Sequence, residues 1–264
     1  MDLVNFKFKK NYGQNFLREQ SIVQKIVDNA DISDNSLVIE IGPGSGMLTK
    51  ALVKKAKNVI CYEIDKTLKV ILDEELKNFD NVTVIYDDFL NRNVADDITE
   101  YDYDKIYVVS NLPYYITTPI INKIINEKID VYKIVVMVQK EVGDRFAAKV
   151  GSKEYNSLTV FLNYYFDIRK LFIVSKNCFI PKPNVDSIVV SLTKKTTLLN
   201  VDDLDLFFKL VRDSFKFKRK TLRNNLKDYD LSKVEKVLEK YDLDLNVRAE
   251  NLDIKIFVDI SNIL

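Results

Sequence analysis

The chain has 264 residues, of which 47% are hydrophobic and 30% are charged, a balance typical of a soluble globular protein with a sizeable core. It contains no histidine, which excludes histidine triads, histidine general bases and histidine metal ligands, so we expect no metal site. No apolar run reaches the roughly 20 residues of a membrane span, and residues 1–10 carry no apolar signal segment, so we expect a cytoplasmic protein without a membrane partner.

Apolar runs and helical patterns alternate through the first half of the chain. Strands are expected at residues 37–41, 58–64, 82–86, 105–109 and 133–138, and helices at 47–57, 65–78 and 118–126. Two further strands are expected at 166–174 and 187–193. A βαβα order of this kind predicts a parallel sheet with helices on both faces.

Beyond residue 195 the strand pattern stops, and helical patterns follow at residues 204–214, 219–226 and 231–240. We therefore expect a domain boundary near residue 195, with a main domain at 1–195 and a helical domain at 196–264. The second segment is short for an independent core, so we expect it to pack on the first. Nothing in the pattern indicates an obligate dimer, and we expect a monomer.

A glycine-rich segment, residues 40–46, ends the first strand and precedes a helix. Gly42 and Gly44 let the backbone approach a ligand closely, and a helix N-terminus favours polar or anionic groups. Pro43 lies between these glycines, so the spacing is not that of the G-x-G-x-x-G dinucleotide motif. A carboxylate at Glu40 would repel a pyrophosphate but would attract an ammonium or sulfonium group. The segment therefore favours S-adenosylmethionine over NAD as the cofactor.

Acidic residues also follow the next two strands. Glu63 ends the second strand, where a carboxylate can accept hydrogen bonds from both ribose hydroxyls of a nucleotide. Asp88 follows the third strand, where it can accept a hydrogen bond from the adenine amine of the cofactor. Acids at three successive strand ends favour a nucleotide pocket over solvated turns, and we include Ile64 and Phe89, their neighbours in sequence, among the expected cofactor contacts.

The segment Asn111-Leu112-Pro113-Tyr114 follows the fourth strand and suits the binding of a planar base that carries an exocyclic amine. The amide oxygen of Asn111 can accept a hydrogen bond from the amine, and the ring of Tyr114 can stack on the base. Pro113 restricts its own backbone and that of Leu112. By itself the segment leaves DNA cytosine or adenine, RNA adenine and a protein glutamine amide open as substrates.

Positive charge is concentrated late in the chain, although the net charge is only +1. Five cations lie within eight residues: Lys216, Lys218, Arg219, Lys220 and Arg223. We expect these side chains to contact the RNA backbone, with Phe215, Phe217 and Leu222 anchoring the other side of the segment in the core.

Seven sequence blocks together resemble the rRNA adenine N6-dimethyltransferase family, and within it the bacterial small-subunit type represented by KsgA. The blocks are residues 13–17, 40–44, 111–114, 139–142, 179–187, 219–226 and 248–252. They are spread over nearly the whole chain, and as a set they are highly specific.

The resemblance implies an α/β fold, a Rossmann-like seven-stranded S-adenosylmethionine-dependent methyltransferase sheet followed by a small all-α C-terminal domain. It implies methyl transfer to N6 of two adjacent adenosines in small-subunit rRNA, giving N6,N6-dimethyladenosine, with the pre-small ribosomal subunit rather than DNA as the partner. The implied cofactor contacts are Asn15, Leu17, Gly42, Glu63, Asp88 and Asn111. The implied contacts to the target adenine are Asn111, Leu112, Tyr114 and Phe179.

Four other functions fit parts of the pattern. Macrolide-resistance relatives, which methylate large-subunit rRNA, rank lower because residues 42–44, 118–119 and 179–187 resemble the small-subunit type. A DNA adenine methyltransferase is disfavoured because no target-recognition domain is evident. A non-catalytic rRNA-binding assembly factor is disfavoured because the acids and Asn111 are intact, and an NAD-dependent oxidoreductase because of the glycine spacing.

Overall fold

The structure is a computed structural model that describes residues 14–113 and 116–264. Contacts between residues divide the chain into two compact units. The first unit comprises residues 1–143 and 169–193, and the second comprises 144–168 and 194–264. The sequence boundary near residue 195 coincides with one of these divisions, but the segment 144–168, which precedes that boundary, belongs to the helical unit.

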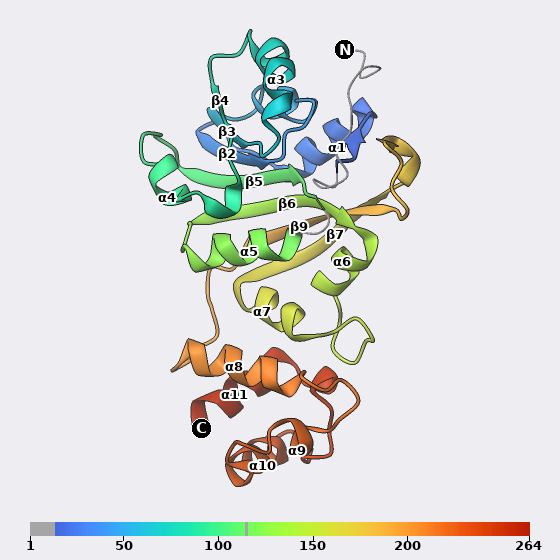
Figure 1. Cartoon of the computed structure of the whole chain (residues 1–264). Coiled ribbons are helices and arrows are strands. Elements are labelled where there is room, and N and C mark those ends of the chain that lie inside the picture. Colours follow the sequence, from blue (N-terminus) through green and yellow to red (C-terminus); the bar gives the residue numbers. More distant parts are fainter. Residues whose placement is uncertain (1–13, 114–115) are drawn as a thin grey trace. The chain divides into compact units, whose positions relative to one another are not determined.

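The first unit is built on a seven-stranded sheet in the order β4-β3-β2-β5-β6-β9-β7 (Figure 1). Its strands are β2 (Ser36–Ile41), β3 (Asn58–Tyr62), β4 (Val82–Ile85), β5 (Lys105–Asn111), β6 (Val131–Gln139), β7 (Phe166–Val174) and β9 (Ser187–Lys194). The strands from β4 to β6 pair in parallel, and β9 pairs antiparallel with β6. The predicted seven-stranded α/β sheet is therefore confirmed.

Parallel strands form here because the sequence offers long apolar runs that can be covered on both faces. All six residues of β2 are buried, as are five of the seven in β5. Parallel strands also need crossover connections, so their carboxyl ends meet at one edge of the sheet. That edge carries the ends of β2, β3 and β5, and with them Ile41, Tyr62 and Asn111.

Helices cover the sheet and connect its strands. They are α1 (Gln20–Ala30), α2 (Thr49–Leu52), α3 (Lys69–Leu76), α4 (Val94–Asp97), α5 (Thr117–Asn126) and α6 (Lys140–Phe146), with short 3-10 turns at Lys66–Leu68 and Phe89–Asn91. The buried positions of α1 are Val23, Ile26, Val27 and Ala30, the spacing of one helix face. They share a core cluster with residues of α2, β2, β5 and β6.

A second, two-stranded sheet ties the beginning of the described chain to a distant loop. Its strands, β1 (Phe16–Leu17) and β8 (Phe179–Ile180), pair antiparallel, and the 3-10 turn Lys176–Cys178 precedes β8. The backbone N–H of Arg18 donates to the carbonyl of Cys178 at 2.9 Å, which extends this pairing. The pairing holds β1 in place at the edge of the first unit, next to the site described below.

The second unit has a core of its own. Its helices are α7 (Ser157–Tyr165), α8 (Leu204–Ser214), α9 (Leu222–Asn225), α10 (Leu231–Glu239) and α11 (Ile254–Ile263), with a 3-10 turn at Ala249–Asn251. Tyr155 and Val160 bury their side chains in one cluster with Phe207, Leu238 and Phe257. The C-terminal segment thus shares its core with residues 144–168, which the sequence analysis had placed in the main domain.

Several predicted helices are shorter in the structure. The helix expected at 47–57 is reduced to α2, and the one expected at 219–226 is reduced to α9. In both places turns replace helix next to lysine-rich sequence, and α9 begins only after an extended Thr221. Within the described residues, no helix is long and apolar enough to span a bilayer.

Candidate active site

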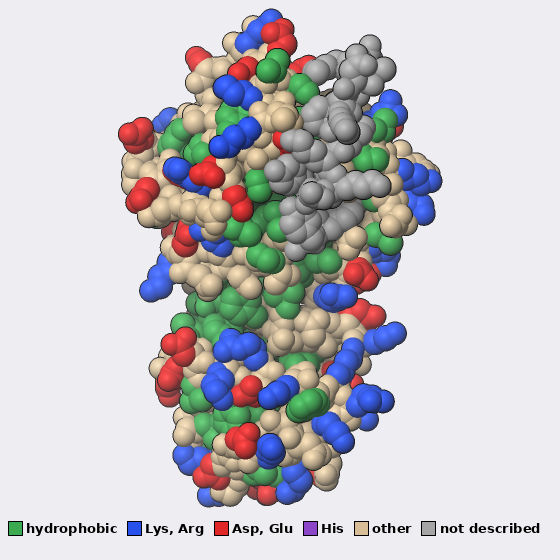
Figure 2. All heavy atoms as spheres, in the orientation of Figure 1, with side chains coloured by type: hydrophobic (Ala, Val, Ile, Leu, Met, Phe, Trp, Pro, Cys, Tyr) green, Lys and Arg blue, Asp and Glu red, His purple; other side chains and the backbone are tan. Residues whose placement is uncertain are grey.

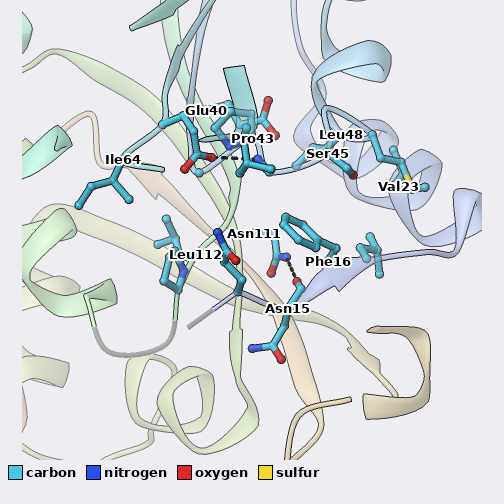
Figure 3. A pocket seen from close by; sticks show the side chains of 18 residues that line it. Asn15, Phe16, Val23, Glu40, Pro43, Ser45, Leu48, Ile64, Asn111 and Leu112 are labelled. Carbon is cyan, nitrogen blue, oxygen red and sulfur yellow. Dashed lines mark hydrogen bonds between the residues drawn. The ribbon is translucent and has the colours of Figure 1, made fainter. Parts of the chain in front are cut away.

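A cavity of about 790 Å³, open solvent at its mouth included, lies at the carboxyl edge of the sheet in the first unit. This is the edge where open α/β sheets bind ligands. The lining residues are Gln14, Asn15, Phe16, Leu17, Val23, Glu40, Gly42, Pro43, Gly44, Ser45, Met47, Leu48, Glu63, Ile64, Leu68, Asn111, Leu112 and Pro113 (Figure 3). Eight predicted cofactor residues are among them: Asn15, Leu17, Glu40, Gly42, Gly44, Glu63, Ile64 and Asn111.

The glycine loop forms one wall of the cavity. Gly44 has a φ of +60°, which L side chains rarely adopt, and a Cβ at this position would lie 2.5 Å from a carbon of the Phe16 ring. Gly42 has a φ of +73° and faces Pro113, whose Cδ would lie 3.9 Å from an added Cβ. The two motifs singled out in the sequence, the glycine loop and Asn111–Pro113, therefore meet in space.

Glu63 presents a buried carboxylate at the end of β3. Its two oxygens accept hydrogen bonds from the backbone N–H of Gly44 at 3.1 Å and of Asp65 at 2.8 Å. Burial raises the pKa of Glu63, and these N–H groups oppose that rise because they favour the ionised form. The carboxylate is thus fixed in direction, and each oxygen keeps a lone pair for a further donor.

Glu40 lies deeper, with 1% of its surface exposed. Its carboxyl group accepts a hydrogen bond from Thr49 Oγ1 at 2.6 Å and a weaker one from Cys61 Sγ at 3.6 Å. Cys61 is the neighbour of Glu40 in the β2–β3 pairing. Burial raises the pKa of Glu40 from 4.5 to about 8. A cation brought into the cavity would favour the ionised form and lower that pKa.

Asn111 closes β5 at the mouth of the cavity. Its Nδ2 donates to the backbone carbonyl of Asn15 at 3.1 Å, which orients the amide and leaves Oδ1 as an acceptor (Figure 3). The next residue, Leu112, is 2% exposed, and its N–H donates to the carbonyl of Met137 at 3.2 Å. The Asn111 side chain and the Leu112 backbone are thus each held by a hydrogen bond to another segment of the chain.

Other predicted site residues are placed differently. Tyr114 lies outside the described residues. Asp88 caps the 3-10 turn that follows β4 by accepting a hydrogen bond from the N–H of Leu90, and Phe89 is buried with its ring edge-to-face against Tyr62. Neither Asp88 nor Phe89 lines the cavity.

Phe179 is also absent from the cavity lining, because it is 2% exposed and pairs in β8 with Leu17. Phe179 belongs to the same buried apolar cluster as Leu17, which lines the cavity. Its stacking on adenine stays a prediction.

Several residues that line the cavity were not predicted from the sequence. Gln14 donates to Asp65 Oδ2 at 2.8 Å and so joins the N-terminal segment to the end of β3. Val23, Leu48 and Leu68 contribute apolar surface from α1, the turn before α2 and a 3-10 turn. Apolar residues on helices read as ordinary core positions, and only the periodic pattern of α1 could have indicated that its face lies near the pocket.

The five predicted RNA-binding cations are in the second unit, and all of them are exposed. Arg223 lies 3.8 Å from Glu235, whereas Lys216, Lys218, Arg219 and Lys220 form no salt bridge with a carboxylate in residues 14–113 and 116–264. The expectation that Phe217 is anchored in the core is wrong, because this side chain is 56% exposed. No cluster of potential metal ligands is found within the same residues.

Comparisons with known proteins agree on one family. The family model described as "Ribosomal RNA adenine dimethylase" matches residues 5–264. "Ribosomal RNA small subunit methyltransferase A" from Bacillus pumilus (strain SAFR-032) is 46% identical and covers 98% of this chain and 92% of its own length. The protein of the same name from Staphylococcus haemolyticus (strain JCSC1435) is 44% identical and covers 97% and 90%.

Solved structures share this fold. A dimethyladenosine transferase from Plasmodium falciparum matches with a TM-score of 0.76 and 28% identity, over 93% of this chain and 95% of its own. The 23S rRNA methyltransferase ErmE matches with the same TM-score and 24% identity, over 93% and 98%, which bears on the fold alone. On the family model and the identity to its relatives, the chain belongs to the ribosomal RNA adenine dimethylase family, and it is an rRNA adenine dimethyltransferase.

Proposed function

We propose that this protein transfers methyl groups from S-adenosylmethionine to N6 of two adjacent adenosines in small-subunit rRNA, giving N6,N6-dimethyladenosine in the maturing small subunit. The names of the relatives from Bacillus and Staphylococcus support the choice of subunit. The cavity at the carboxyl edge of the sheet supports a nucleotide-like cofactor, and the exposed cations of the second unit support an RNA substrate.

The residues of the cavity fit S-adenosylmethionine. The oriented carboxylate of Glu63 can accept hydrogen bonds from the ribose hydroxyls, and Gly42 and Gly44 leave room for close approach of the ligand to the backbone. A nearby ammonium or sulfonium group would favour ionisation of the Glu40 carboxyl group. When bound, the cofactor supplies the electrophilic methyl group. Asp88 and Phe89, outside the cavity wall, are proposed to contact the adenine side of the cofactor.

The geometry of Asn111 is the observation that carries the proposal. Its amide is oriented by the carbonyl of Asn15, so Oδ1 can accept from the target amine at the mouth of the cofactor cavity. The amine nitrogen of adenine is a poor nucleophile because its lone pair is delocalised into the ring. Acceptance of its two N–H groups by Asn111 Oδ1 and the Leu112 carbonyl draws the nitrogen toward tetrahedral geometry and directs the lone pair at the methyl carbon.

Proton transfer requires no imidazole in this scheme, which suits a chain without histidine. The methylated amine is a cation that loses its proton readily to water. The protein then contributes mainly through positioning and preorganised acceptors. Tyr114 is proposed to stack on the adenine after it leaves its helix.

The second unit is proposed to hold the rRNA. Lys216, Lys218, Arg219, Lys220 and Arg223 are exposed and clustered, as contacts to a phosphate backbone require. Because such contacts release counterions, binding should weaken as salt rises. The segment 196–264 would thus serve binding, while residues 1–195 carry the chemistry.

Methyl transfer to a panel of acceptors tests the proposal. The protein is incubated with radiolabelled S-adenosylmethionine and, separately, unmodified small subunits, large subunits, free rRNA and DNA, and the labelled nucleosides are identified. We expect N6,N6-dimethyladenosine with small subunits only. Label in large-subunit rRNA or in DNA would overturn the choice of substrate, and the absence of label with every acceptor would overturn the enzymatic proposal.

A further inference from the structure

Phe217 lies on the surface of the second unit in the midst of positive charge. The side chain is 56% exposed, and each of its neighbours from Lys216 to Lys220 is exposed as well. Figure 2 shows Lys and Arg side chains gathered on the face of the helical unit in view. Single exposed apolar side chains are common on protein surfaces, and this ring is distinguished by the cations beside it. A ring flanked by cations suits a ligand that offers both a flat apolar face and negative charge.

The backbone beneath the ring is held by a single side chain. The N–H of Phe217 donates to Oδ1 of Asn225 at 3.2 Å, while Nδ2 of Asn225 donates to the carbonyl of Ser214 at 2.7 Å and to that of Phe217 at 3.3 Å. The N–H of Lys220 also donates to the Phe217 carbonyl, at 2.8 Å. The turn is therefore fixed before any ligand binds, so less conformational entropy is lost when the ring is covered.

The cations around the ring are available to a polyanion. The Nζ of Lys216 lies 5.8 Å from the centroid of the Phe217 ring, and Nζ of Lys218 donates to the carbonyl of Lys153 at 2.7 Å. Neither lysine forms a salt bridge with a carboxylate within the described part of the chain, while the charge of Lys216 acts on Asp213, whose pKa is lowered chiefly by its hydrogen bond from Lys209. A ring flanked by exposed cations favours a nucleic acid strand, because every base offers a π face and every nucleotide a phosphate.

We propose that Phe217 stacks on an unpaired base of the rRNA while the flanking cations contact the phosphates on either side, with Asn225 as the residue that positions the ring. The proposal rests on the proposed function for the identity of the RNA. It adds a base contact in the second unit that is separate from the adenine pocket. Stacking tolerates any base, so the contact contributes affinity and register rather than sequence selection.

Fluorescence offers a direct test because the chain contains no tryptophan. Phe217→Trp introduces a single indole at the proposed contact. Leu204→Trp serves as the matched control, since Leu204 is 42% exposed in the same unit but is flanked by Asp203 and Asp205. On titration with an unmodified small-subunit rRNA transcript, we expect quenching of the Phe217→Trp emission and none for Leu204→Trp.

Binding measurements separate stacking from charge. Phe217→Ala should weaken rRNA binding by about tenfold and leave the slope of affinity against salt unchanged, because a stack releases no counterions. Lys218→Gln should instead reduce that slope by about 1. The exposed ring contributes little to the core, so the thermal unfolding temperature of Phe217→Ala should match that of the wild type.

Two outcomes would overturn the inference. One is a Phe217→Ala protein that binds rRNA as tightly as the wild type, combined with unquenched emission from Phe217→Trp. The other is a change in self-association of Phe217→Ala without a change in RNA affinity, which would assign the ring to a contact between copies. The wild type is assayed for methyl transfer in parallel, so failure of the proposed function would be recognised separately.

Discussion

The cofactor cavity of the first unit differs from the basic segment of the second unit, residues 216–223, in how its charged side chains are held. In the cavity, Glu40 and Glu63 are buried, and hydrogen bonds from Thr49, Gly44 and Asp65 fix their direction. In the basic segment the charges are exposed and largely free of ion-pair partners. Buried and oriented groups suit a small ligand that must be positioned for chemistry, whereas exposed charges suit a long polyanion.

This difference gives each region its own sensitivity. A buried group acts through geometry, so a single atom can matter by orders of magnitude. An exposed cation acts through a screened field, so its loss is modest and depends on salt. Mutations in the cavity should therefore change the rate or cofactor affinity, and mutations in the basic segment should change rRNA affinity and its salt dependence.

The largest effect is expected at Asn111. Asn111→Ala removes the oriented acceptor, and we expect the single-turnover rate of methyl transfer at saturating S-adenosylmethionine to fall by about 100-fold or more. Asn246→Ala is the control, because Asn246 is exposed in the second unit and bonds only to Asp244 in the same turn. A near wild-type rate for Asn111→Ala would remove this residue from the mechanism.

Gly44 tests whether the cavity depends on its exact shape. Gly44→Ala places a Cβ 2.5 Å from the Phe16 ring at a φ of +60°, so we expect cofactor affinity measured by calorimetry to fall at least about tenfold. Gly151→Ala has similar backbone strain, with a φ of +80°, but its nearest neighbour is 3.8 Å away in the second unit. Equal losses of cofactor affinity in both proteins would indicate general destabilisation rather than a blocked site.

Charge reversal tests the other side of the comparison. The double variant Lys218→Glu with Arg219→Glu should bind rRNA about tenfold more weakly at low salt. The slope of log affinity against log salt concentration should become shallower by about 1 to 2. Lys236→Glu with Lys240→Glu, in the exposed part of α10 and the residue after it, provides a charge-matched control. If the two double variants behave alike, only net charge matters and the basic segment has no special role.

Glu40 is tested through the stability of the fold rather than through activity or RNA binding. Burial holds its proton in the folded state up to pH of about 8, whereas the unfolded chain, with a pKa near 4.5, releases it earlier. This contribution to stability is complete below pH 4.5 and is lost as the pH rises through about 8, by at most about 1.4 kcal/mol per pH unit. Urea unfolding should show a steeper decline for wild type than for Glu40→Gln over this range, and parallel curves would refute the pKa rise.

The sheet could be predicted from the sequence because its strands are continuous apolar runs. The predicted strand at 166–174 has the same bounds as β7, and the other strands differ by a few residues at their ends. The glycine loop and the strand-end acids also indicated the correct edge of the sheet, since parallel strands must end together. The periodic face of α1 carried a signal of the same kind, although no helix was predicted there.

Other features depend on long-range packing that one sequence does not display. Residues 144–168 join the second unit because Tyr155 and Val160 complete its core, and nothing local in the sequence marks that choice. The exposure of Phe217 is equally hidden, because Phe215, two residues earlier, does pack on the core, and the sequence does not distinguish the two rings. The burial of Phe179 in β8 was not predicted either, since pairing of β1 with β8 joins segments far apart in the chain, and its contact with adenine stays a prediction.

The central claim is that the cavity and Asn111 dimethylate two adjacent adenosines of small-subunit rRNA. Counting N6,N6-dimethyladenosine by mass spectrometry in small subunits, at the time when the wild-type reaction with S-adenosylmethionine is just complete, tests it most directly. We predict two dimethylated adenosines per subunit with the wild-type protein at that time, and about a hundredth of that amount or less with Asn111→Ala. Dimethyladenosine formed equally by both proteins, or formed only in large subunits, would contradict it.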